Sequence, residues 1–359
     1  MCKKCFIVLF CLTLLFFPSK FGHTSSSITQ QKINHAVTVF MHNNHVPGLA
    51  LAVLKDGKPL LIKGYGYANI ATNDPVNTKT LFGIGSVSKV ITTFALMTLV
   101  QNEKVNINHS VLDYVPKAPQ KWRLVTIQQL LSHSSGIPQH RGPHLPWIKV
   151  WNDLAKKPLQ FQPGTAIAYN NFGFAVLGRV IENVSHQTLL NYLTHAVFNP
   201  LGMHDTGLPD ALFPANLATG YQSQAGKITL NPNQRPWQQM GGSGGIVSNI
   251  DDMAKWDKAM SAGAILTPAA YRQMWTPVFL KNGKPAGYKN WAWALGWQIS
   301  SIDGKRIVFK NGAIRGYSSW MERHLDDKVS IIILTNTNHV PLRRLAKRIF
   351  NQVMNAPAN

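Results

Sequence analysis

The sequence is poor in acidic residues and has almost no cysteine. It contains 15 Asp and Glu against 36 Lys and Arg, which gives a formal net charge of +21 at pH 7. This charge suits contact with anionic cell-wall polymers, lipid head groups or nucleic acid, and does not distinguish among them. All three cysteines lie within the first 11 residues. The rest of the chain can therefore form no disulfide bond and no cysteine-ligated metal site.

The apolar run at the N-terminus, residues 6–17, is too short to span a bilayer, which needs about 20 residues. Lys3 and Lys4 precede this run, and Pro18 and a small polar stretch follow it. This order is typical of a secretory signal peptide. We therefore predict a signal peptide over residues 1–24 and a mature protein that is periplasmic or secreted, with no membrane span after processing.

The whole chain of 359 residues is 45% apolar and has no internal repeat, and it is long enough to bury a large core. Apolar spacing predicts an N-terminal helix, and Asp56-Gly57 predicts a turn between two strands. Further strands are predicted near the C-terminus, at 306–310, 317–323 and 328–336, followed by a helix at 341–354.

The segment between these two sets of strands, residues 86–240, has mostly helical patterns. The order strands, helices, strands predicts a helical lobe inserted into a lobe that contains a sheet. We expect one catalytic domain over 28–355, with a sheet lobe at about 28–80 and 245–355 and a helical lobe at about 81–244.

Ser86-Val87-Ser88-Lys89 is the first motif with candidate chemistry. Residues i and i+3 share one face of a helix, so the Lys89 ammonium group can reach the Ser86 hydroxyl. Gly85 precedes the serine and an apolar helix follows it, which can place a nucleophile at a helix N-terminus, where free N–H groups favour negative charge. Taken alone, the motif is better explained by a capping serine and a surface lysine, so a catalytic role needs support from other motifs.

Tyr-x-Asn and Lys-x-Gly each occur three times, and their context selects one copy of each. Tyr169-Asn170-Asn171 lies between a turn and the start of an apolar helix, whereas the other two tyrosine copies lie in a strand end and a polar loop. Lys310-Asn311-Gly312 ends a strand and leads to the next one, so its backbone can follow the edge of a cleft.

In this order and spacing, the sequence resembles the β-lactamase superfamily of penicillin-recognising serine hydrolases. The resemblance is to the branch that contains class C β-lactamases, D-alanyl-D-alanine carboxypeptidases and related carboxylesterases, and it covers about residues 30 to 355. It rests on the segments LFGIGSVSK, VTIQQLLSHSSGIP, PGTAIAYNNFGFAVLGRVIE, FNPLGMHDTG, GGIVSNIDDMAKW, FKNGAIRGYSS and IIILTN. It implies an α/β (α+β) serine β-lactamase and penicillin-binding-protein-like fold, in which helices flank an antiparallel sheet and a mostly helical subdomain is inserted.

The resemblance also implies roles for the motif residues. Ser86 is the nucleophile, Lys89 accepts or relays its proton, and Tyr169 is the partner in proton transfer. Lys310 controls Tyr169 electrostatically and attracts an anionic group of the substrate. The backbone N–H groups of Ser86 and Ala313 form the oxyanion hole. The expected substrate-binding residues are Asn171, Asn311, Gly312, His140 and Arg344.

Three positions depart from class C β-lactamases. Asn311 stands where those enzymes usually carry a threonine that helps to bind the β-lactam carboxylate. Gly244 stands in place of a tyrosine that lines the site, and Pro341 in place of an asparagine. These departures argue against an optimised β-lactamase and leave the acylation residues in place.

The predicted activity is therefore that of an exported serine hydrolase, acting on a β-lactam, a D-Ala-D-Ala-type stem peptide or an ester. The alternative is a catalytically idle relative that holds a cell-wall polymer, and the complete Ser-Lys-Tyr-Lys set favours the enzyme. No cofactor, metal or nucleic acid is expected, and the protein is expected to be a monomer that can contact an anionic cell-envelope surface. Two further expectations are an active-site wall at 241–245 and core packing for Trp291, Trp293 and Trp297.

Overall fold

The computed structural model describes residues 21–140, 146–209, 215–224, 226–231 and 237–356. Most of the predicted signal peptide and all three cysteines lie outside these residues, so export stays a prediction. Within the described residues, no helix combines the length and the apolar character that crossing a membrane would require.

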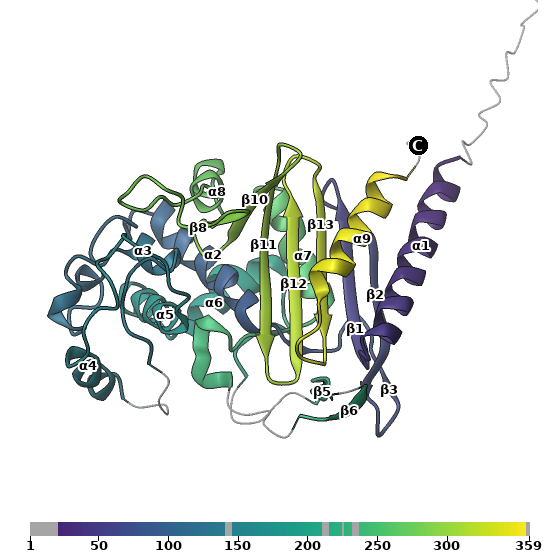
Figure 1. The fold of residues 1–359 in the computed structure, drawn as a ribbon, viewed down its shortest axis with the longest axis horizontal. Helices are drawn as coiled ribbons and strands as arrows, with labels where there is room; N and C mark the ends of the chain where they lie inside the picture. The colour runs from purple at the N-terminus through teal and green to yellow at the C-terminus, as the bar shows by residue number, and fades with distance from the viewer. Residues whose placement is uncertain (1–20, 141–145, 210–214, 225, 232–236, 357–359) are drawn as a thin grey trace, which may run out of the picture.

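The centre of the fold is a nine-stranded sheet with the strand order β3-β2-β1-β13-β12-β11-β10-β9-β8, and its neighbouring strands pair antiparallel (Figure 1). Its strands are β1 (Gly48–Lys55), β2 (Lys58–Asn69), β3 (Asp74–Pro75), β8 (Gly287–Tyr288), β9 (Trp291–Trp293), β10 (Gln298–Ile302), β11 (Lys305–Ile314), β12 (Tyr317–His324) and β13 (Val329–Thr335). The strands predicted from the sequence, near 49–68 and at 306–310, 317–323 and 328–336, all belong to this sheet.

The hairpin between β1 and β2 turns at Asp56 and Gly57, as predicted. Both residues have positive φ angles, 52° and 71°, which is the backbone of a two-residue type I′ turn. In β1, alternate side chains belong to the two separate apolar clusters on either side of the sheet, with Leu51 in one and Ala52 in the other. The strand is therefore buried on both faces.

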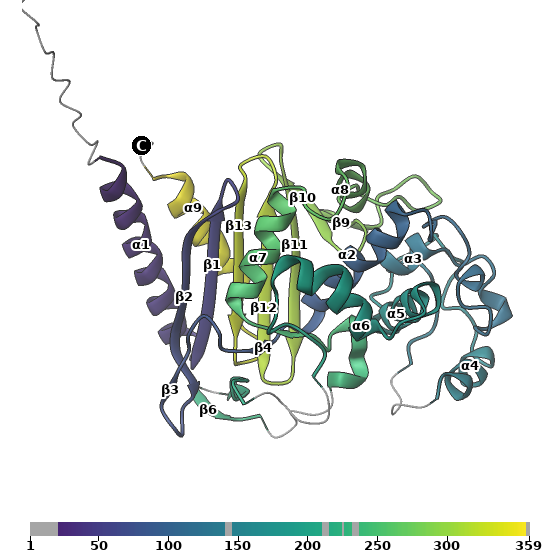
Figure 2. The ribbon, with the colours of Figure 1, turned by 180° about the vertical axis from the view of Figure 1, so that it is seen from behind.

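Helices cover both faces of the sheet (Figures 1 and 2). The terminal helices α1 (Phe21–Asn43) and α9 (Leu342–Met354) pack side by side on one face, and α7 (Ile250–Ser261) packs on the other. The short strands β4 (Phe82–Gly83) and β7 (Val247–Ser248) pair where the chain leaves the sheet for the helical lobe and returns from it.

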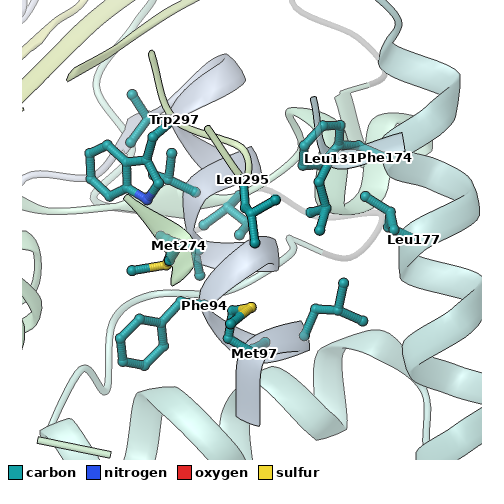
Figure 3. Close-up of a cluster of buried hydrophobic side chains, with 14 of the residues drawn as sticks. Phe94, Met97, Leu131, Phe174, Leu177, Met274, Leu295 and Trp297 are labelled. Carbon is teal, nitrogen blue, oxygen red and sulfur yellow. The ribbon is translucent and has the colours of Figure 1, made fainter. Parts of the chain in front are cut away.

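The helical lobe is built around α2 (Ser88–Gln101), whose side chains from Ser88 to Leu99 are buried. Figure 3 shows Phe94 and Met97 of α2 with side chains of α3 and α5 on one side, and Met274 and Trp297 on the other. Because α2 is enclosed, its first residues are held in a fixed position. The other helices here are α3 (Ile127–Leu131), α4 (Trp147–Ala155), α5 (Asn171–Ser185), α6 (Leu189–Leu193) and α8 (Pro268–Met274).

Two parts of the fold were not predicted from the sequence. The segment expected to be mostly helical also contains a hairpin of β5 (Tyr221–Gln224) and β6 (Lys227–Leu230). Strands β8 to β10 extend the sheet beyond β11 toward the helical lobe. These strands are short, so alternation of apolar and polar residues gives little signal over their length.

Candidate active site

Ser86 lies in a single turn of 3-10 helix (Gly85–Val87) that leads directly into α2. Gly85 has a φ of +52°, and a Cβ atom there would lie 2.9 Å from the backbone nitrogen of Ala313. A side chain at position 85 would push β11 away from this turn. Glycine is therefore required for the backbone of Ala313 to lie beside Ser86.

Gly312 brings β11 against the same turn. A Cβ atom at this position would lie 2.1 Å from the carbonyl oxygen of Ile84 and 2.2 Å from Oγ of Ser319. The Ser319 hydroxyl donates a hydrogen bond to that carbonyl at 2.7 Å. β10 pairs with β11 only as far as Phe309, so the following residues form a free edge beside Ser86. This arrangement suits an oxyanion hole formed by the N–H groups of Ser86 and Ala313.

The Ser86 hydroxyl is hydrogen-bonded to Tyr169 and Lys89. Its Oγ lies 2.6 Å from the phenol oxygen of Tyr169 and 3.3 Å from Nζ of Lys89. Lys89 Nζ also donates to Oδ1 of Asn171 at 2.7 Å and to the carbonyl oxygen of Ser243. An uncharged amine has two N–H donors and one lone pair. The two carbonyl oxygens can use both donors and leave the lone pair directed to the Ser86 hydroxyl.

Burial favours the uncharged form of Lys89. The side chain is fully buried, and desolvation together with the nearby charge of Lys310 lowers its pKa well below the usual value of 10.5. Lys310 is also buried, and desolvation lowers its pKa to about 7. Two amines that share a dry site disfavour each other's protonation, so Lys89 can act as a base near neutral pH.

The ring of Tyr169 lies between these two amines. Nζ of Lys89 is 5.0 Å from the ring centroid and Nζ of Lys310 is 5.1 Å from it. Desolvation raises the pKa of Tyr169 to about 12, although its hydrogen bond to Ser86 acts in the opposite direction. The resting phenol therefore keeps its proton and can donate it.

Asn170 and Gln139 hold the segment that carries Tyr169. The Asn170 side chain caps α5 by accepting a hydrogen bond from the N–H of Gly173, and it donates to the carbonyl of Ile137 at 2.7 Å. Gln139 Nε2 donates to the carbonyl of Tyr169 at 2.9 Å. The Tyr169 phenol is thus positioned by the Asn170 cap of α5 and by the loop that contains Ile137 and Gln139.

Two aromatic side chains at the site were not assigned from the sequence. The ring of Trp293 stacks on Tyr169 with the centroids 6.0 Å apart, and Lys310 Nζ lies 4.5 Å from its centroid. His133 lies 4.5 Å from the Tyr169 ring, and its Nδ1 accepts a hydrogen bond from the N–H of Asn170 at 3.1 Å. Burial and the two nearby amines lower the pKa of His133 well below its usual value, so the imidazole is neutral.

The glycine-rich segment 241–245 packs against α2, as a wall of the site would. The carbonyl of Ser243 binds Lys89, and that of Gly242 accepts a hydrogen bond from Thr92 at 2.8 Å. A Cβ atom at Gly244 would lie 2.7 Å from Cε of Met240. Met240 therefore occupies the space that a larger residue at 244 would need.

Three other residues predicted to bind substrate, Asn311, His140 and Arg344, lie in different parts of the structure. Asn311 is exposed on the free edge of β11. The His140 ring packs edge-on against Phe172, 5.6 Å between centroids, near the start of α5. Arg344, predicted to bind substrate, is not brought to Ser86. It lies on α9 and lines a groove with Lys32 of α1.

The position of Arg343 explains why Arg344 points away from the site. Successive helix residues point about 100° apart, so only one of two adjacent arginines can face the sheet. That residue is Arg343, whose guanidinium lies 6.0 Å from the ring centroid of Phe309, two residues before Asn311.

The fold and the site together are those of a serine hydrolase. A family model described as Beta-lactamase matches residues 33–353, and the chain belongs to the β-lactamase family, whose members are serine hydrolases. The family, fold and enzyme class predicted from the sequence are therefore confirmed.

Individual relatives are distant. Protein flp of Staphylococcus aureus is 25% identical over 341 residues, which cover 91% of this chain and 67% of that protein. Unguisins hydrolase ungD' of Aspergillus campestris is 30% identical over 319 residues, which cover 82% of this chain and 59% of that protein.

Solved structures share the fold. An octameric penicillin-binding protein homologue from Pyrococcus abyssi superposes with a TM-score of 0.78 at 24% identity, over 90% of this chain and 77% of that one. D-amino acid amidase from Ochrobactrum anthropi SV3 also gives a TM-score of 0.78, at 22% identity, over 91% of this chain and 99% of that one.

Proposed function

We propose that the protein is an exported hydrolase that cleaves small esters and D-Ala-D-Ala-type peptides through an acyl-enzyme on Ser86. The observation that carries this proposal is the buried Lys89 amine, with two carbonyl oxygens for its N–H donors and the Ser86 hydroxyl at 3.3 Å. Export is supported by the order of charges and apolar residues in the first 24 residues of the sequence.

Acylation begins when Ser86 Oγ attacks the substrate carbonyl carbon and passes its proton to the Lys89 lone pair. The carbonyl oxygen gains negative charge and is stabilised by the N–H groups of Ser86 and Ala313. Tyr169, 2.6 Å from Ser86 Oγ, donates its phenol proton to the leaving nitrogen or oxygen as that bond breaks. The Lys89 ammonium group then returns a proton to the phenolate.

Deacylation uses the same groups with water as the nucleophile. Water attacks the ester carbonyl on Ser86 and gives a proton to Lys89. When the intermediate collapses, the bond to Ser86 Oγ breaks and the acid is released, and Lys89 passes this proton to Oγ, which restores the Ser86 hydroxyl. A lysine whose pKa is lowered by burial can accept and release this proton at neutral pH.

Acylation of Ser86 can be tested with an active-site phosphonate or a labelled penicillin. We expect the adduct on the peptide that contains Ser86, and no labelling of Ser86→Ala. Ser88 provides a matched control because it is buried and its Oγ accepts a hydrogen bond from the N–H of Ile246 at 3.1 Å. Ser88→Ala should still be labelled, and an adduct on Ser88 in the natural protein would refute the assignment.

β-Lactams should acylate Ser86 but turn over slowly. Asn311 offers no hydroxyl to the drug carboxylate, and the wall at Gly244 carries the apolar side chain of Met240 and no polar group, so the acyl group is loosely held. A misplacement of about 1 Å can cost on the order of 100-fold in rate. We expect kcat/KM for a nitrophenyl ester, which carries no carboxylate, to exceed that for a cephalosporin.

Asn311→Thr tests this explanation. The new hydroxyl should raise kcat/KM for the cephalosporin about tenfold, the value of one added hydrogen bond to a charged group. It should leave the ester nearly unchanged, because the ester has no carboxylate to bind. Rapid cephalosporin hydrolysis by the natural protein, or an equal gain on both substrates, would contradict the proposed substrate preference.

A further inference from the structure

The face of the molecule formed by α1 and α9 is strongly basic and separate from the active site. The first acidic residue of the chain is Asp56 and the last is Asp327, so neither helix contains a carboxylate side chain. Both helices pack on the sheet face opposite α7, at the end of the molecule away from α3 and α5 (Figures 1 and 2).

A groove of about 500 Å³ lies along the seam between these two helices. Four cationic side chains and three amides line it, and they are Lys32, Arg344, Lys347, Arg348, Asn351, Gln352 and Asn355. Within the residues that the structure describes, none of the four cations forms an ion pair. The groove therefore presents uncompensated charge together with hydrogen-bond donors, which is the chemistry that binds phosphate groups.

Exposed apolar side chains lie beside the cations. Gln352 donates a hydrogen bond to the carbonyl of Lys32, which fixes how the two helices lie against each other. Ile28 and Met354 lie close to this contact along their helices and are 49% and 37% exposed. A soluble polyanion gains nothing from such side chains, whereas a bilayer accepts them between its head groups while the cations hold the phosphates.

We propose that the α1–α9 face binds the surface of a membrane rich in anionic phospholipids, with a lipid phosphate in the groove. The active site lies between the helical lobe and strand β11, outside this contact, so it stays open to substrate while the protein is bound. The proposal depends only on this face and is independent of the substrate that Ser86 attacks.

The test measures binding of the full-length protein to vesicles of phosphatidylcholine alone and of phosphatidylcholine with phosphatidylglycerol. The basic and apolar N-terminal segment, residues 1–20, is the same in every variant, so the informative quantity is the change, from one variant to another, in the ratio of the two affinities. The natural protein should prefer anionic vesicles, and this preference should fall steeply between 0.1 and 1 M salt, because screening shortens the range of the attraction.

Lys347→Glu/Arg348→Glu should lower the preference for anionic vesicles about 30-fold, since each basic residue near such a surface contributes about fivefold. The control is Lys117→Glu/Lys156→Glu, which changes the net charge equally at exposed positions of the helical lobe. This control should keep the preference. Both variants should keep the ester hydrolysis and the melting temperature of the natural protein, which shows that folding is intact.

Three results would overturn the proposal. One is equal binding to both kinds of vesicle, and another is an equal loss in the two charge variants. The third is binding of soluble polyphosphate as tight as that of anionic vesicles and equally sensitive to Lys347→Glu/Arg348→Glu, which would assign the groove to a polyanion.

Discussion

Tyr169→Phe should lower kcat/KM for a small ester by about 10³-fold, within the range usual for loss of a general acid or base. The phenol oxygen lies 2.6 Å from Ser86 Oγ, closer than Nζ of Lys89 at 3.3 Å. Its removal leaves the leaving group without a proton donor. The Tyr169 residue is 44% exposed, so the variant should fold with little change in melting temperature.

Lys89→Met should cause a similar loss, because it removes the base while keeping a long apolar side chain in the buried position. If Tyr169 and Lys89 pass one proton in sequence, the double variant should be little worse than either single variant, since losses within one catalytic unit are not additive. Steady-state kinetics of the two single variants and the double variant measure this coupling.

A second tyrosine controls for general effects of removing a phenol. Tyr67 is followed by Asn69 in the same Tyr-x-Asn pattern, and 46% of the residue is exposed. Tyr67→Phe should leave kcat/KM unchanged. Fully additive losses in Tyr169→Phe and Lys89→Met, or a large loss in Tyr67→Phe, would contradict a shared proton-transfer role for Tyr169 and Lys89.

Local patterns predicted much of the centre of the site. Ser86 and Tyr169 are far apart in the chain, yet each lies at the start of a helix after a turn that the local pattern shows. Lys310 was expected at the end of a strand, and it lies inside β11, which continues to Ile314. The structure brings all three together, with Lys89 and Lys310 on either side of the Tyr169 ring. From two motifs that each occur three times, context also selected the copies that the structure brings together beside Ser86.

Residues that reach the site through tertiary packing could not be predicted in this way. Trp293 was expected to pack in the core, and it is indeed buried, with 4% exposed. What no local pattern shows is that Lys310 lies against its ring. That contact arises because the short strand β9 places Trp293 beside the end of β10, and its register with β10 depends on the sheet as a whole.

Arg344 was predicted as a site residue, and the structure directs its side chain elsewhere. A basic residue near the start of the last helix was expected to bind substrate. Whether it faces the site depends on helix rotation, and one residue of difference moves the side chain about 100°. The structure places Arg343 over Phe309 and Arg344 in the α1–α9 groove.

Lys310→Met should lower kcat/KM for a neutral ester at pH 7 about 100-fold, comparable to the loss of one electrostatic contact to the transition state. It should also move the acidic limb of the pH profile to higher pH. The positive charge of Lys310 helps to lower the pKa of Lys89. Without it the pKa of Lys89 rises, and a smaller fraction of Lys89 is uncharged at neutral pH.

The direction of the shift separates this role from simple loss of structure. Because deprotonation of Lys89 restores the base, raising the pH should recover part of the activity of Lys310→Met, and a merely misfolded variant would recover none. Lys55→Met is the matched control, since Lys55 also begins a Lys-x-Gly triplet and is exposed at the end of β1. Its profile of kcat/KM against pH should match that of the natural protein. An unchanged or downward-shifted limb in Lys310→Met would mean that Lys310 does not set the pKa of Lys89, and that its contribution is confined to attracting anionic substrates.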